Sequence, residues 1–142
     1  MNINSSTGLF ELSTGAFGQD LQEKAADLYS DLIEMHAINA IAAGILTQSI
    51  RTQKAAGTLH DLIETLKAKP SAKFRPYTSL NNLLSGYYPL EMESATHELL
   101  DAFADLSLDQ SLLLFQHGSF FSDSVKESAG RISEAVEEYK AG

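Results

Sequence analysis

One spacing constrains the fold of this chain more than any other feature of its sequence. From residue 21 to residue 53, one set of positions recurs at alternating intervals of four and three: Leu21, Ala25, Leu28, Leu32, Met35, Asn39, Ala42, Leu46, Ser49 and Gln53. An α-helix places residues at that spacing along one side, and a strand does not. The spacing predicts a long N-terminal helix with a heptad-patterned seam of about nine turns.

The middle of this segment carries no charge. No Asp, Glu, Lys or Arg lies between Glu34 and Arg51. A second apolar stripe accompanies the seam: Ile38, Ile41 and Ile45. A third side carries small residues: Ala37, Ala40 and Gly44. Because this stretch lacks charge and carries two apolar stripes, we expect it to be buried from more than one side. Small side chains let another backbone approach closely, so the small residues are candidate interaction positions.

Asn39 interrupts the seam at a position where an aliphatic side chain would stabilise the helix pairing more. In paired helices one polar residue of this kind can fix the register and the number of partners. The alternative is that Asn39 lies at the edge of an intramolecular bundle and reaches water or a carbonyl. We treat Asn39 as a candidate interaction residue.

Shorter helices are expected after this segment. Gly57 weakens a helix, and Thr58 with Asp61 offers a new cap, which predicts a second helix over residues 59–68. Further helical segments are predicted at residues 80–85, 89–106, 107–118 and 123–140. No segment alternates apolar and polar residues with an enrichment of β-branched residues, as a strand would. The predicted fold class is an all-α helical bundle with a long N-terminal helix and a C-terminal amphipathic helix.

The domain organisation follows from composition. Residues 1–19 are rich in Asn, Ser, Thr and Gly without a consistent apolar period, so we expect a flexible N-terminal arm. Residues 20–142 are expected to form a single all-α domain, with a basic linker at residues 69–77 between helices.

The distribution of charge along the sequence excludes some classes of partner. The chain has 10 basic and 19 acidic residues, so its net charge is −9. A negative protein is a poor ligand for nucleic-acid phosphates, and we predict no nucleic-acid partner. Because no uncharged run reaches the ~18 to 20 residues that a membrane-spanning helix needs, we also predict no membrane span.

The linker at residues 69–77 places cations beside aromatic rings. Lys73 and Arg75 alternate there with Phe74 and Tyr77. Such a combination suits a carboxylate-rich or phosphate-bearing partner, and these four are candidate interaction residues. The alternative is a solvated connection whose aromatic side chains cover the core.

The amphipathic segment 89–106 has one acidic side, on which Glu98, Asp101 and Asp105 are candidate interaction residues. An acidic face steers a basic partner and raises the association rate more than the affinity. On the same segment, His97 has Glu93 and Asp101 four residues to either side, which could supply part of a metal site. One helix cannot complete that site, so we predict a solvated histidine, no metal and no cofactor.

No group of residues combines a nucleophile or base with a second reactive group at motif spacing, and we predict that the protein is not an enzyme. The leading functional expectation is a small, acidic, helical protein-interaction module of adaptor, chaperone or inhibitor type. Its heptad spacing favours self-association as well, with a dimer preferred over larger oligomers. The protein partner itself has no signature in the sequence.

Two alternatives stay open. One is a structural or secreted component of a bacterial helical assembly, exported without a Sec signal. The other is a metal-dependent helical-bundle enzyme centred on His97. The first residues lack the basic region and apolar stretch of a Sec signal, so the expected compartment is the cytoplasm, with secretion by a non-Sec route as the alternative.

Overall fold

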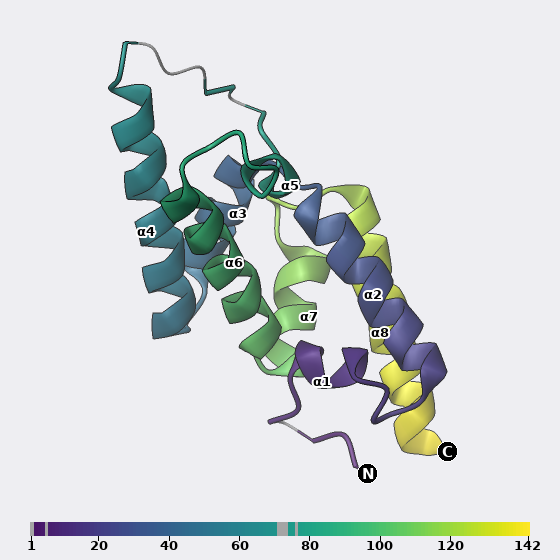
Figure 1. Ribbon diagram of the computed structural model, residues 1–142. Coiled ribbons are helices and arrows are strands. Elements are labelled where there is room, and N and C mark those ends of the chain that lie inside the picture. Colours follow the sequence, from purple (N-terminus) through teal and green to yellow (C-terminus); the bar gives the residue numbers. More distant parts are fainter. Residues whose placement is uncertain (1, 5, 71–73, 76) are drawn as a thin grey trace. The chain divides into compact units, whose positions relative to one another are not determined.

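A computed structural model describes residues 2–4, 6–70, 74–75 and 77–142 of the protein (Figure 1). These residues form helices and no strand, so the predicted all-α class is confirmed. The helices are α1 (Leu9–Ser13), α2 (Gln19–Ile33), α3 (Ala37–Leu46), α4 (Ile50–Lys67), α5 (Leu80–Leu83), α6 (Leu90–Asp105), α7 (Leu108–His117) and α8 (Asp123–Ala141). None of the helices in these described ranges is long and apolar enough to cross a membrane.

The chain divides into two compact units. The first unit consists of Met1–Leu32 and Phe103–Gly142, and the second is Ile33–Ala102. The first unit therefore contains α1, nearly all of α2, α7 and α8, whereas the second contains α3, α4, α5 and most of α6.

The prediction of one long helix over residues 21–53 is wrong, because α2, α3 and α4 divide that segment. The first break lies at residues 34–36. There the Ala37 N–H donates to the Thr78 carbonyl at 2.8 Å, and the Leu80 N–H donates to the Met35 carbonyl at 3.0 Å. An uninterrupted helix would use that N–H and that carbonyl within itself, so pairing with residues 78–80 replaces the helical bonds.

The second break lies at residues 47–49 and has a local cause. The Thr47 hydroxyl donates to the Gly44 carbonyl at 2.8 Å, and the Ser49 hydroxyl accepts from the Thr52 N–H at 3.2 Å. Gln53 also donates to the Thr47 carbonyl, at 2.5 Å. Polar side chains thus satisfy the backbone groups at the end of α3 and the start of α4, which favours two capped helices over one continuous helix.

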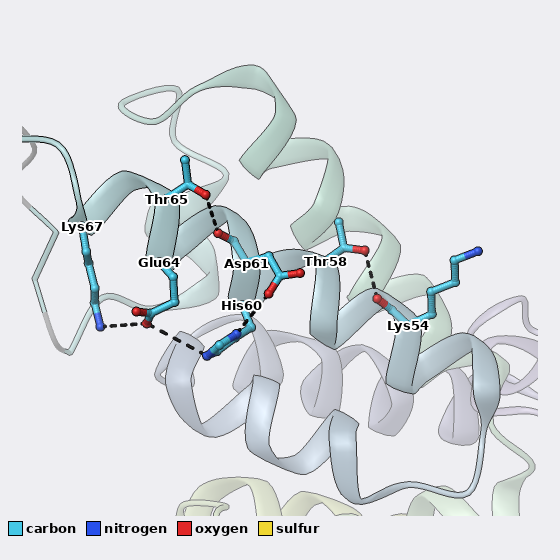
Figure 2. Close-up of polar contacts among 7 residues, drawn as sticks. All are labelled: Lys54, Thr58, His60, Asp61, Glu64, Thr65 and Lys67. Atoms are coloured by element: carbon cyan, nitrogen blue, oxygen red, sulfur yellow. Dashed lines mark hydrogen bonds and ion pairs between the residues drawn. The ribbon is translucent and has the colours of Figure 1, made fainter.

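The predicted break near Gly57 is also wrong, because α4 runs through this position without interruption. Thr58 does not cap a new helix; its hydroxyl donates to the Lys54 carbonyl one turn earlier, at 3.0 Å (Figure 2). Thr65 makes the same bond to the Asp61 carbonyl, at 2.9 Å. A mid-helix glycine costs about 1 kcal/mol, which the burial of neighbouring side chains such as Ala56 and Leu59 offsets.

The later helices match their predictions closely. The helix α6 begins directly after Pro89, and α8 begins at Asp123. Ser107 caps α7 by accepting from the Gln110 N–H at 3.3 Å, and α7 ends before Gly118. Capping residues and amphipathic spacing were sufficient at these ends because both act within a few residues.

In the first unit, α7 packs against α8, and α2 runs alongside α8 (Figure 1). Phe103, Phe115 and Phe121 form successive edge-to-face contacts in its core, with ring centroids 5.7 and 5.2 Å apart. The expected N-terminal arm contributes here as well, because Leu9 and Leu12 of α1 are fully buried. The mobility of residues 1–19 in solution stays a prediction.

Candidate interaction surfaces

In the second unit, α3 packs against α4 with one side only (Figure 1). The residues of that side are buried: Ala37, Ala40, Ile41, Ala43 and Gly44. On the opposite side the exposed fractions are 44% for Ile38, 48% for Ile45 and 65% for Leu46. Ala42, half-buried, lies on the same side by helical periodicity. We call Ile38, Ala42, Ile45 and Leu46 the α3 face.

A helix that is apolar on all sides is normally covered on all sides. The helix α3 has no Asp, Glu, Lys or Arg, and its α3 face is nevertheless exposed. Asn39 is half-buried at the edge of this face, the only polar side chain within α3. The structure thus places the predicted register residue beside an uncovered aliphatic surface.

The small residues of α3 lie on its buried side. Ala37 and Ala40 are fully buried, and Gly44 is buried too. A Cβ atom on Gly44 would lie 2.9 Å from the Ala56 Cβ and 3.2 Å from the Leu99 Cδ1, which is too close for a rigid neighbour such as Ala56. At Gly44, the expected close approach is therefore made by the chain's own α4 and α6.

A groove of about 520 Å³ lies between α4 and α6 in the same unit. Its lining combines aliphatic and charged side chains: Ile50, Arg51, Lys54, Ala55, Thr58, Ala95 and Glu98. Across it, the Arg51 Nε donates to the Glu98 Oε1 at 2.9 Å. Ile50 lies at its edge with 82% of its surface exposed. The groove offers apolar area with a positive charge, that of Lys54, beside an ion pair.

The three predicted acidic residues of α6 are all exposed. Glu98 accepts a hydrogen bond from Arg51. Asp101 belongs to the second unit and Asp105 to the first. Steering of a basic partner by these residues stays a prediction.

The aromatic residues of the linker contact other parts of the second unit. The Lys67 ammonium lies 5.6 Å from the centre of the Phe74 ring, and the Phe74 and Tyr88 rings are 6.1 Å apart. The Tyr77 ring contacts the His36 ring in a tilted arrangement, with 5.3 Å between ring centres. Arg75 is exposed, and Lys73 lies outside the described residues. Phe74 and Tyr77 thus take part in ring contacts within the chain.

His97 is exposed on α6, between half-buried Glu93 and exposed Asp101. Over the described ranges, the His, Asp and Glu side chains form no group of three or more with the geometry to hold a metal ion. Its predicted role as a solvated histidine stays a prediction.

A second cleft, of about 310 Å³, lies between α2 and α8 in the first unit and is polar. Its lining residues are Asp27, Ser30, Asp31, Ser124, Glu127, Ser128 and Arg131. Ser128 donates to the Asp31 carboxylate at 2.5 Å, and Arg131 lies 3.7 Å from the Glu127 carboxylate. Several of its polar groups are therefore already paired with one another.

The sequence pattern did not identify Leu46 as part of the α3 face, nor Ile50 and Lys54 as lining residues of the groove between α4 and α6. Leu46 was assigned to a seam, and Ile50 lies where the long helix was expected to continue. The available signal was the charge-free run itself: sixteen residues, 35–50, without Asp, Glu, Lys or Arg are more than one ten-residue helix can bury on one side.

Comparisons with protein-family models, with curated proteins and with solved structures find no match to this chain.

Proposed function

We propose that the protein is a small, acidic, non-enzymatic interaction module of adaptor, chaperone or inhibitor type, and that its partner binds in the groove between α4 and α6. The observation that supports this proposal is Ile50, an isoleucine left 82% exposed at the edge of a partly aliphatic groove. Fully burying such a side chain is favourable by about 1.5–3 kcal/mol, so a ligand that covers Ile50 gains affinity.

The groove suits a partner segment with one apolar side chain and a nearby carboxylate. Ile50, Ala55 and Ala95 supply the surface for the apolar group. Lys54, and the N-terminal end of α4, favour a negative charge beside it. The rest of the protein is acidic, but salt screens charges farther than about 8–10 Å away, so the near Lys54 has the larger effect.

An amphipathic helix meets these requirements with an aliphatic residue and an Asp or Glu one turn apart. Such helices bind in apolar grooves through a few anchoring side chains. The lining supplies aliphatic area and charge rather than a nucleophile with an adjacent base, which favours binding over bond-breaking chemistry.

Panning a display library of helical peptides against the whole protein tests this proposal. Enriched peptides should carry an aliphatic residue within one turn of Asp or Glu. Their affinity should fall by about tenfold or more for Ile50→Asp, because a carboxylate then faces the apolar surface. The matched control is Leu113→Asp, an exposed leucine on α7 in the other unit, which should leave affinity unchanged.

Two results would contradict the proposal: enrichment of peptides without this pattern, or peptides that bind Ile50→Asp as tightly as the original protein. Circular dichroism of both variants should match the original chain, since both side chains are exposed.

A further inference from the structure

We infer that the α3 face is a self-association surface, which pairs with the α3 face of a second copy of this chain in an antiparallel, two-fold arrangement. This inference goes beyond the proposed function, because the α3 face and the groove between α4 and α6 are different surfaces with different occupants. The two can therefore fail separately.

The shape and chemistry of the α3 face suit helix-on-helix packing. Ile38 and Ile45 are seven residues apart and so lie nearly in line along the helix, with Ala42 between them. A small residue at the centre lets two helix axes approach closely, while the flanking isoleucines fill the space to either side. Asn39, at the edge, is placed to disfavour shifted registers that would leave its amide without a hydrogen-bond partner.

Charge points to a second copy as the occupant. In a two-fold dimer each patch meets an identical patch, so charges near the axis face their own kind. The whole chain has a net charge of −9, yet residues 35–50 contain no Asp, Glu, Lys or Arg. A charge-free patch is the place where two acidic copies can meet with the least repulsion.

Charge also selects the antiparallel orientation. The α3 helix is preceded by exposed Glu34 and followed by exposed Lys54 in the first turns of α4, while the Arg51 guanidinium is already bonded to Glu98. Antiparallel pairing brings the acidic end of one copy to the basic end of the other, twice per dimer. Parallel pairing would place like charges together at both ends, which is unfavourable.

Light scattering of the full chain over a range of concentrations measures this association. The original protein should reach twice the mass of one chain. Ile45→Glu should raise the dimer dissociation constant by about 100-fold or more, because two carboxylates would be buried near the axis. Leu113→Glu, which adds the same charge at an exposed leucine of α7, should remain dimeric.

A second variant, Ile38→Lys, keeps the test decisive if Ile45→Glu fails to fold, as judged by circular dichroism. A monomeric original protein at every concentration tested would overturn the inference, as would an Ile45→Glu protein that dimerises normally. Neither result affects the peptide-binding test at Ile50.

Orientation has its own test, since the natural sequence contains no cysteine. Mixed under oxidising conditions, Ile38→Cys and Leu46→Cys copies should form the heterodimeric disulfide in preference to either homodimeric one. Faster disulfide formation between two Ile38→Cys copies would overturn the antiparallel arrangement.

Discussion

The helices α8 and α3 differ in how much of their apolar surface a single chain buries. In α8, one side is buried through residues such as Val125 and Ile132, and the other carries charged residues such as Glu134 and Glu137 that water solvates. In α3, the side opposite the core is aliphatic. The comparison shows that α8 needs nothing further to be stable in water, whereas α3 retains surface whose burial is still favourable.

The largest expected effect is a contrast between two isoleucines. Ile132→Ala, in the core side of α8, should lower the free energy of unfolding by about 2–5 kcal/mol, because it leaves a cavity at a fully buried position. The same change at Ile45 should alter the unfolding free energy of dilute, monomeric protein by at most about 0.5 kcal/mol. Urea titration followed by circular dichroism measures both.

Equal losses at the two positions would mean that Ile45 is already buried within one chain, contrary to its 48% exposure. At higher protein concentration the Ile45→Ala loss should grow, because dimerisation stabilises the folded state by mass action.

Alanine substitutions at two separate glycines test how tightly the buried side of α3 packs. Gly44→Ala should destabilise the protein by about 1–3 kcal/mol, because the new methyl group would lie 2.9 Å from the Ala56 Cβ. Gly57→Ala, where a Cβ has no neighbour within 4 Å, should stabilise it by about 0.5–1 kcal/mol. Thermal unfolding should therefore shift in opposite directions, and a stabilising Gly44→Ala would show that α3 packs less tightly on α4 than described.

The smallest effect concerns the helix ends. Ser49→Ala at the start of α4 and Ser122→Ala at the start of α8 should each cost about 1 kcal/mol, since each hydroxyl accepts a first-turn N–H. Similar losses in urea unfolding would show that serine caps stabilise the starts of α4 and α8 to the same extent. A Ser49→Ala protein with unchanged stability would count against the capped break at residues 47–49.

The parts of the fold that local physics decides could be predicted from the sequence. Ser107, Gly118 and the spacing after Asp123 act within a turn or two, and the helices they define were predicted closely. The break at residues 34–36 could not be predicted this way. It depends on backbone bonds with residues 78–80, more than forty positions away, and the heptad spacing continues through it unchanged.

For a related reason, the sequence predicted only some residues of the candidate surfaces. The spacing assigned Leu46 to a seam and left Ile50 inside a continuous helix. Once Thr47 and Ser49 end one helix and begin another, the later positions rotate relative to the earlier ones. Which isoleucines face α4 and which face water then depends on tertiary packing around Gly44.

The oxidation rate of an Ala42→Cys protein reports directly on whether two α3 faces meet. A disulfide needs Cα atoms about 4.4–6.8 Å apart, which two copies reach only if their α3 faces meet near Ala42. The covalent dimer should form rapidly and at protein concentrations where Leu113→Cys stays monomeric on a non-reducing gel. Equal rates for the two single-cysteine proteins would contradict self-association through α3.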